Sequence, residues 1–580
     1  MKTWTVTTTA DNGKGSLRET IKYAKSGDTI IFSSHLANKQ ITLNKRRLDI
    51  DKNLTIDGSN APGLTISGNK KQQIFRLAGK GRQFNLSNIS LADGFLDKGP
   101  GGAIWASQPE AQIEVENVRF TNNISRVGGA IWAKSGAKVT VINSQFNGNK
   151  ATKKDSDIAA GAIAVFDKSE LVVKGSKFTN NQGDVGGAIS TVFTEVTLED
   201  SEFIDNKSRR FSGAVNIDGA TIPNQKRYNP SNRNGDGEPG EILLRNNIFE
   251  KNQATGSGGG LTVWGYDQDS VLIDNNTFAN NKVAKSDGGN ARGGGLRVSG
   301  FVTIKNSHIT GNESEQDGGG LWYQGEVPIQ IINSDFSGNQ AKKVGGAIYN
   351  GQWGGQTVIE GTSFRENLAG KEAGAIYTAK NQPIVIEGSV FESNEAKEVR
   401  ATKNSNYEVI RNANDEFLKV PENNLYQGDR SKNKFHGGNG DDILLGLGGN
   451  DTLFGNGGND SLQGDSGKNV LHGGAGDDQF IGGTGEDIFI GGAGSDNYIL
   501  GDSQGSFYNK TRNQDQAVIK DFNPDEDTIQ LSGKPSNYTL GSTAVGKHSG
   551  TGIFGKNLIA VIADVEPEDF NLRGDYIDYV

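Results

Sequence analysis

Two short words recur in fixed order through the first two thirds of the chain. One is GGAIW at residues 101–105 and 128–132, and the other is an FxxN word such as FTNN at 120–123. Each word occurs ten times with variations, and most steps between copies are 25 to 28 residues. Ten ordered copies of two words imply ten stacked copies of one structural unit. The aligned glycines are Gly102, Gly129, Gly161, Gly187, Gly213, Gly260, Gly295, Gly320, Gly346 and Gly374.

Each unit is predicted to be one three-strand coil of a parallel β-helix. Stretches such as QIEVENVRF and KVTVINSQF are rich in β-branched residues and lack helical spacing. Equivalent residues of stacked coils lie about 4.8 Å apart. The phenylalanines should therefore form one interior column, and the asparagines from Asn123 to Asn394 another. Asn suits its column because it tolerates the left-handed turn conformation and its amide can bond the coils above and below.

The repeated words resemble those of a known family. Over roughly residues 95–395 they are similar to the GGA(I/L/V) and FxxN repeats of the polymorphic outer-membrane protein family of bacterial adhesins. This resemblance implies a right-handed β-helix and an adhesive role.

An open stack of coils exposes strand edges, so its first coil needs a cap. The segment SLRETIKYAKSGDTIIF at 16–32 predicts one. Ser16 and Glu19 have capping-box spacing, and Leu17, Ile21 and Ala24 form an apolar helical stripe. A short helix over this segment is expected to cover the first coil.

From Gly437 the chain changes to seven nonapeptides of the pattern G-G-x-G-x-D-x-U-x, preceded by a degenerate copy at 428–436. Each nonapeptide predicts a glycine-rich half-turn followed by a short strand with one large apolar residue pointing inward. These repeats resemble the RTX (repeats-in-toxin) calcium-binding β-roll. The resemblance implies a parallel β-roll with calcium as its ligand.

Two nonapeptides complete one turn of such a roll, so loops 18 residues apart share an edge. A hard cation needs six or more oxygen ligands, which two loops can supply as carboxylates and glycine carbonyls. Asn469, which follows Lys468, departs from the pattern, so sites that use its loop should be weak. One edge should hold Asp442, Asp460, Asp478 and Asp496, and the other Asp451, Asn469 and Asp487. The six aspartates of these edges are the predicted calcium ligands.

The predicted fold is therefore all-β, a right-handed parallel β-helix followed by an RTX parallel β-roll. The expected domains are a cap with the first coils, the repeats, a terminal cap and linker, the calcium repeats, and a β-rich segment with a secretion signal. Their respective bounds are 1–94, 95–395, 396–427, 428–502 and 503–580.

Charge and apolar content restrict the partners. The formal net charge of −9 argues against nucleic acid, and residues 428–502 hold 12 acidic and 4 basic residues of that balance. No stretch of 18 apolar residues occurs, so no transmembrane segment is predicted. The segment AVIKDFNPDEDTIQL at 517–531 resembles the one that follows the roll in exported RTX proteins. That resemblance implies an extracellular protein, secreted through a type I channel.

Two classes of function remain open. The adhesin-like words and the calcium repeats favour an extracellular adhesion, matrix or glycan-binding protein, whose partner is an extracellular polysaccharide or a cell-surface receptor. The alternative is a calcium-dependent polysaccharide lyase or epimerase, because some epimerases join a β-helix to RTX modules. Such enzymes need clustered carboxylates with a general acid or base. No Asp–Asp pair precedes Asp441, so no catalytic residue is predicted.

The long step after Gly213 is the best candidate for a groove. Residues 217–240 form a Pro/Asn/Gly-rich excursion flanked by Arg209 and Arg210, with WGYDQD following at 264–269. This excursion is either a tolerated insertion or a site for a glycan or partner. Aromatic residues at the third position after the aligned glycine either fill the core or form an outward sugar-binding face, and the sequence leaves both open. They are Trp105, Trp132, Tyr323, Tyr349 and Tyr377.

Overall fold

A computed structural model of the chain divides into two compact units, Met1–Lys343 with Ala347–Gly355, and Val344–Gly346 with Gln356–Val580. One α-helix and two short 3₁₀ helices accompany the strands in the part of the chain that the structure describes. The all-β prediction is confirmed. The described residues are 1–220, 240–266, 269–286, 288–325, 329–351, 357–371, 373–378, 384–387, 389–392, 394–396, 410–412, 425–427, 432, 434–438, 440–508 and 515–580.

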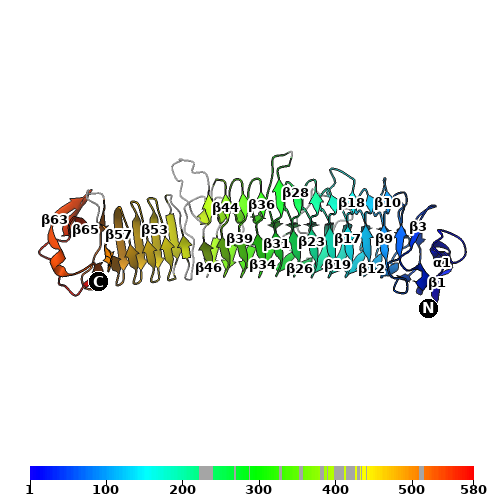
Figure 1. Ribbon diagram of the computed structural model, residues 1–580, viewed down its shortest axis with the longest axis horizontal. Coiled ribbons are helices and arrows are strands. Elements are labelled where there is room, and N and C mark those ends of the chain that lie inside the picture. Colours follow the sequence, from blue (N-terminus) through cyan, green and yellow to red (C-terminus); the bar gives the residue numbers. More distant parts are fainter. Residues whose placement is uncertain are drawn as a thin grey trace. The chain divides into compact units, whose positions relative to one another are not determined.

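The first unit begins with a small cap, drawn in dark blue in Figure 1. Strand β1 (Thr3–Val6) pairs in parallel with β2 (Asp28–Phe32), and helix α1 (Leu17–Tyr23) connects them. The helix buries Leu17 and Ile21. The predicted capping helix is therefore confirmed.

Only half of the expected capping box forms at the start of α1. The Ser16 side chain accepts a hydrogen bond from the Glu19 backbone N–H at 3.2 Å. The Ser16 backbone N–H donates instead to the Gly13 carbonyl at 3.1 Å. The turn before the helix thus satisfies the donor that the Glu19 carboxylate would otherwise accept.

Most described coils of the β-helix hold four short strands in three sheets, whereas β19 (Ile163–Lys174) and β22 (Ile189–Glu199) each run through the first two strand positions of their coils. In one coil the four strands are β11 (Ile104–Ala106), β12 (Gln112–Glu116), β13 (Arg119–Thr121) and β14 (Ile124–Ser125). The first two belong to the same sheet. The three-strand prediction is thus right for the number of sheets and wrong for the number of strands, because bends between β11 and β12 divide one side of the coil.

Strands of successive coils pair in parallel and in register. β13 pairs with β17 (Gln145–Asn147), so that Phe120 lies opposite Phe146. β14 pairs with β18 (Lys150–Ala151) in the third sheet. Figure 1 shows these columns as rows of arrows along the first unit. Within β12 exposed and buried residues alternate, so the period of two places one face of each strand in the core.

The predicted phenylalanine column is confirmed. Ring centroids of consecutive members lie 4.5 to 4.9 Å apart with the rings nearly parallel. All members are fully buried. This separation matches the spacing of strands in a sheet, so the parallel register stacks each ring on the next. The members are Phe120, Phe146, Phe178, Phe203, Phe249 and Phe278.

The predicted asparagine column is also confirmed. The Asn206 side-chain amide donates to Asn252 Oδ1 at 3.0 Å and to the Phe178 carbonyl at 2.9 Å. Its Oδ1 accepts from the backbone N–H and the side chain of Asn181. The left-handed conformation, however, belongs to the residue before each stacked asparagine, as at Asp205 with φ of 54°. The stacked amide therefore joins coils, while its neighbour makes the turn.

The register corrects the alignment of three glycines. Val215 lies opposite Leu261, and Leu321 lies opposite Ile348. The residues equivalent to Gly213 are consequently Gly259, Gly294 and Gly319, each one position before the predicted glycine. This one-residue shift cannot be seen in the sequence because each of these sites has three consecutive glycines. The register is set by the leucine that follows, which must be buried.

The same register shows which face carries the aromatic row. Trp105 lies opposite Trp132, and Trp322 lies opposite Tyr349. Ile104 and Ala106 point into the core on either side of Trp105, so the row faces outward. Tyr323 was assigned to this row wrongly. It lies one position further on and is buried, 1 % exposed.

In the second unit one strand per nonapeptide builds two facing sheets. One sheet contains β53 (Thr452–Gly457), β55 (Val470–Ala475) and β57 (Glu486–Ala493). The other contains β52 (Ile443–Leu445), β54 (Ser461–Gln463), β56 (Gln479–Ile481) and β58 (Asn497–Ile499). Pairing joins nonapeptides 18 residues apart. The inward residues Leu444, Leu453, Leu462, Leu471, Phe480, Phe489 and Tyr498 are fully buried.

The chain after the roll continues both sheets. β61 (Gln516–Ile519) extends the sheet of β57, and β62 (Thr528–Leu531) pairs with β58. β65 (Leu558–Ala563) pairs in parallel with β61. The strands β64 (His548–Phe554) and β63 (Thr539–Val545) follow in the same sheet through antiparallel pairs. They cover the edge that the parallel strands would otherwise leave open.

Candidate metal centre

The half-turns of the roll require glycine two residues before the inward aspartate or asparagine. Gly467 has φ of 131°, and a Cβ there would lie 1.4 Å from the carbonyl oxygen of Gly449 in the preceding turn. No side chain fits that space. The glycine-rich spelling therefore follows from the close approach of stacked turns.

The structure brings the predicted aspartates together in two rows. On one edge the backbone N–H of Asp442 donates to Asp460 Oδ1 at 2.7 Å, and that of Asp460 to Asp478 Oδ1 at 2.8 Å. Asp496 Oδ1 accepts in turn from the Asp478 backbone N–H at 3.0 Å. We call this series the long aspartate ladder.

The second edge repeats the arrangement through the departing residue. The backbone N–H of Asp451 donates to Asn469 Oδ1, and that of Asn469 to Asp487 Oδ1, both at 2.9 Å. The Asn469 amide nitrogen is buried and has no acceptor. Asn469 therefore keeps the ladder bond of an aspartate but offers a donor where its neighbours offer a second oxygen.

The ladder aspartates are buried, and burial is the largest cause of their raised pKa values. The pKa is raised to about 8 for Asp460, about 7 for Asp478, and about 6 for Asp487 and Asp496. Neighbouring carboxylates raise it further, whereas the ladder hydrogen bonds lower it. Without a cation, the stacked carboxylates thus oppose their own ionisation.

The second oxygen of the ladder aspartates fits a hard cation. Oδ2 of Asp460 and Oδ2 of Asp478 are buried and accept no hydrogen bond. Each lies against a glycine: a Cβ added at Gly455 would be 2.0 Å from Asp460 Oδ2, and one added at Gly473 would be 2.1 Å from Asp478 Oδ2. A buried carboxylate oxygen without a donor is costly, and a calcium ion takes such oxygens as ligands.

No three His, Asp or Glu side chains of the described residues converge on one point as a ready-made metal site. Each nonapeptide contributes at most one inward carboxylate to its ladder, so side chains alone cannot complete a shell of six to eight oxygens. The remaining ligands would have to be backbone carbonyls and water.

Sequence reasoning missed four residues at the C-terminal end of the roll, one of which, Asp527, extends the long aspartate ladder. Asp527 Oδ1 accepts from the Asp496 backbone N–H at 3.0 Å, and Asp515 and Asp521 accept from backbone N–H groups of Gly485 and Gly491. The hydroxyl of Tyr508 donates to Asp487 Oδ2 at 2.9 Å. The six-residue spacing of the three aspartates was a signal that could have found them. Nothing in the sequence marks Tyr508.

Other charged groups of the candidate regions are structural. Arg209 and Arg210 bind the two oxygens of Asp184 at 2.9 and 3.1 Å. Of the predicted excursion at 217–240, residues 221–239 lie outside the described residues.

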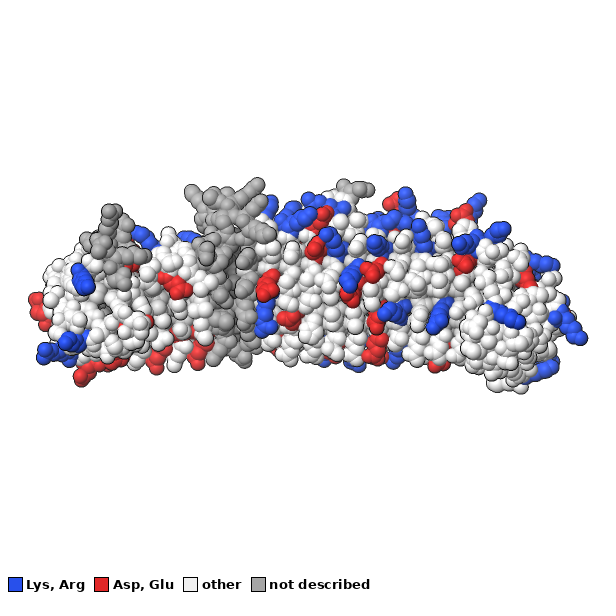
Figure 2. Space-filling model, in the orientation of Figure 1, with Lys and Arg blue, Asp and Glu red and all other residues white. Residues whose placement is uncertain are grey.

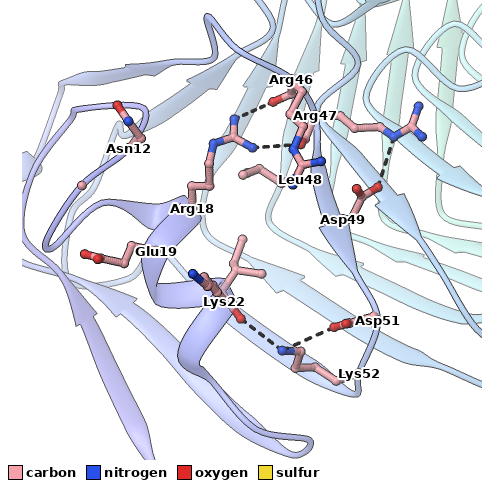
Figure 3. A pocket seen from close by; sticks show the side chains of 12 residues that line it. Asn12, Arg18, Glu19, Lys22, Arg46, Arg47, Leu48, Asp49, Asp51 and Lys52 are labelled. Atoms are coloured by element: carbon pink, nitrogen blue, oxygen red, sulfur yellow. Dashed lines mark hydrogen bonds and ion pairs between the residues drawn. The ribbon is translucent and has the colours of Figure 1, made fainter.

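A pocket at the cap, shown in Figure 3, encloses about 430 Å³. Arg18 pairs with Asp11 at 2.7 Å and donates to the carbonyls of Arg46 and Arg47. Lys52 donates to the Ile21 and Ala24 carbonyls at the end of α1. These bonds hold the helix against the first coils, so the pocket is part of the cap.

The geometry defines an all-β solenoid with metal-binding repeats, and the comparisons agree. The model of the right handed beta helix region matches residues 52–237 and 231–414. The chain belongs to this β-helix family. The model of the RTX calcium-binding nonapeptide repeat matches residues 427–462, 436–471 and 463–498. The repeats are calcium-binding.

Comparison with individual proteins adds less. No curated protein matches the chain. Among solved structures, tailspike protein 3 of bacteriophage CBA120 is similar at 11 % identity and a TM-score of 0.37. The match covers 69 % of this chain and 58 % of the tailspike chain. Among the described residues, no helix has the length and apolar content to cross a bilayer.

Proposed function

We propose that the protein is an extracellular adhesion, matrix or glycan-binding protein whose β-helix presents the binding surface and whose roll is locked by calcium. The observation that carries this proposal is the long aspartate ladder, with its buried and unpartnered Oδ2 atoms at Asp460 and Asp478. Such a ladder is stable where calcium is plentiful. Extracellular calcium modules bind with dissociation constants of about 10⁻⁴ to 10⁻³ M, and this range suits the proposed location.

The proposed calcium ligands are the six inward aspartates of the two ladders. Oδ1 of Asp460, Asp478, Asp487 and Asp496 accepts a backbone N–H from the preceding loop of its edge. Oδ2 of Asp460 and Asp478 has no donor, so these oxygens and the loop carbonyls are the proposed contacts of the ion. Asn469 supplies an amide nitrogen at this position, and the ion beside it is expected to bind more weakly. The ligands are Asp442, Asp451, Asp460, Asp478, Asp487 and Asp496.

The proposed route out of the cell is type I secretion, directed by residues 503–580. This proposal rests on the resemblance of 517–531 to the segment that follows the roll in exported RTX proteins. A roll that needs calcium would remain unfolded in a cytosol poor in calcium, which suits passage through a narrow channel.

The test is retention of the calcium-loaded full chain on immobilised polysaccharides and on cell surfaces, with chelator as the comparison. Calcium-dependent retention supports the proposal. Absence of retention on every polymer and surface contradicts it. Release of unsaturated or epimerised sugars from any retained polymer would assign the alternative function, a polysaccharide lyase or epimerase.

A further inference from the structure

One outward-facing row of the β-helix is buried along its middle. Its members are polar, yet they are only 0 to 6 % exposed between Ser190 and Trp322. The same row is half-exposed at Trp132 and Tyr349, on either side of this stretch. Other parts of the chain therefore cover this outward row, and one of its members, Arg297, lines a pocket. In register, the buried members are Ser190, Asn216, Thr262, Arg297 and Trp322.

A pocket of about 690 Å³ opens beside this row, within the first unit. Its lining comes from several successive coils and includes two acidic residues, Asp155 and Asp184. Asp184 is already bound by Arg209 and Arg210. The pocket therefore has an excess of positive charge that its own carboxylates do not neutralise. The basic residues of the lining are Lys154, Arg209, Arg210, Lys285, Arg292 and Arg297.

Arg297, on strand β33 (Leu296–Ser299), is the buried cation of this pocket. It is 6 % exposed, and no carboxylate of the described residues forms an ion pair with it. Its Nη1 is 3.4 Å from Ser257 Oγ, and its Nε has no acceptor. Burial, and then the charge of Arg292, lower the pKa of Arg297 to about 9. Burying a cation without an anion is costly, so an anionic group bound beside Arg297 would be stabilised.

Aromatic rings fix the position of this guanidinium. Its Cζ lies 3.6 Å from the ring centroid of Trp264 and 4.7 Å from that of Trp322. Arg292 Cζ lies 4.9 Å from the Trp322 ring. Cation–π contacts of this kind hold the two guanidinium groups in place before a ligand arrives. A preformed pair of planar donors matches a carboxylate or a sulfate, which accepts two parallel hydrogen bonds.

We propose that this pocket binds the carboxylate or sulfate group of an acidic polysaccharide, with Arg297 as the principal contact, Arg292 as the second, and Trp264 as an apolar wall for the sugar ring. The proposal rests on the glycan-binding function proposed above and names its ligand class and its site.

A polymer fits better than a small anion because the positive charge continues beyond the pocket. Figure 2 shows Lys and Arg gathered along the edge of the first unit that carries the third sheet. Lys150, Lys207 and Lys282 are exposed and lie on alternate strands of that sheet, with glutamines between them. Lys282 also pairs with Glu313. A chain with repeated negative charges can follow this edge while one group enters the pocket.

The experiment measures binding of the full chain, in calcium, to polygalacturonate, dextran sulfate and uncharged dextran. Arg297→Gln removes the principal contact, and Arg292→Gln removes the second from a half-buried position. The control Arg119→Gln removes the same charge from an exposed position on β13. Thermal melting checks the fold of each variant. If Arg297→Gln does not fold, Arg292→Gln decides the outcome.

We expect the wild type to bind polygalacturonate or dextran sulfate but not dextran. The arm that binds identifies the anion as a carboxylate or a sulfate. Losing one charge-assisted contact should weaken binding about tenfold or more in Arg297→Gln, and leave it unchanged in Arg119→Gln.

Equal weakening in Arg119→Gln and Arg297→Gln, or equal binding to dextran, overturns the site while the glycan-binding function stands. Binding to no polymer contradicts the site and the proposed function together. Tighter binding to single-stranded DNA than to both acidic polysaccharides would overturn the ligand class.

Discussion

The backbone N–H of Asp460 donates to Oδ1 of Asp478 at 2.8 Å, across 18 residues of chain. The contact fixes the carboxylate of one loop against the backbone of another before any ion is present. Because Oδ2 of Asp478 then has no hydrogen-bond donor, the geometry that builds the ladder also leaves an oxygen that can bind a cation. Assembly of the roll and metal binding are therefore two aspects of one structure.

The metal-free roll should become less stable as the pH rises. The folded pKa values of Asp460 and Asp478, about 8 and about 7, exceed the ordinary value of 3.8. Between about pH 4 and pH 8 the folded state thus holds more protons than the unfolded state, and stability falls with increasing pH. We expect a higher melting temperature for the roll at pH 5 than at pH 8 in chelator. A melting temperature that rises with pH would contradict the buried ladder.

Calcium affinity should respond to single changes on the ladders. Asp478→Asn keeps an Oδ1 acceptor for Asp460 but removes a charged oxygen, so we expect weaker calcium binding by calorimetry. Asn469→Asp should strengthen it by supplying the missing oxygen, at the cost of lower stability in chelator. Asp502→Asn, outside both ladders, is the matched control. Unchanged affinity in Asp478→Asn would exclude this carboxylate as a ligand.

Loss of one ring from the phenylalanine column should destabilise the β-helix strongly. Phe178 stacks on Phe146 and Phe203 at 4.6 and 4.9 Å. Phe178→Ala leaves a cavity that neighbouring coils cannot close, and we expect a loss of about 3–5 kcal/mol. Phe178→Leu should cost much less because it fills most of the volume. Urea unfolding in chelator measures both, and equal losses would contradict the packing argument.

Loss of one amide from the asparagine column should cost less than loss of a ring, but more than a surface change. Asn206→Ala leaves the backbone N–H of Asn181 and the Phe178 carbonyl without their partners. A buried group left unsatisfied costs about 1–3 kcal/mol. Asn147→Ala, on an exposed position of β17, is expected to change stability by less than about 0.5 kcal/mol. Similar values for both variants in urea unfolding would show that the column adds no stability.

The two parts of the chain should unfold separately when calcium is varied. Coils of a solenoid contact only their neighbours, and metal binding stabilises only the region that holds its ligands. Heating the full chain in chelator should leave one cooperative transition from the β-helix, and calcium should add or raise a second. Differential scanning calorimetry distinguishes these events. If chelator abolishes both transitions, the roll is required for folding of the whole chain.

Most of the fold could be predicted from the sequence because a repeat shows its register by repetition. The phenylalanine and asparagine columns and the two aspartate edges all followed from counting. The count of strands did not, because the bends between β11 and β12 have no fixed spelling. The alignment on Gly260, Gly295 and Gly320 was wrong by one residue for a related reason. In a run of three glycines the sequence does not show which glycine is equivalent to Gly213, and burial of the following leucine decides it.

The pocket at Arg297 could not be predicted, because its parts lie in different coils and share no word. Arg297 replaces Thr262 of the preceding coil and Trp322 of the next. In the sequence, each of these three residues is an ordinary substitution at an outward-facing position. Only the stacking brings the arginine between two tryptophans. The row of Ser144, Ser176 and Ser201, whose hydroxyls accept backbone N–H groups from coil to coil, was also missed, although each serine stands two residues before its column phenylalanine.

The in-register columns have a consequence for how such a chain can change over generations. Most coils present the same phenylalanine, asparagine and strand edges to the coil on either side, so one such coil is an acceptable neighbour for another. A duplication or deletion of about 26 codons would lengthen or shorten the stack by one step of about 4.8 Å and leave every remaining contact intact. Insertions shorter or longer than a whole coil can be accommodated only in the turns between strands. The long step after Gly213 lies at such a position, between β25 and β26. Growth by whole coils thus conserves the core, and new surface enters only at the turns.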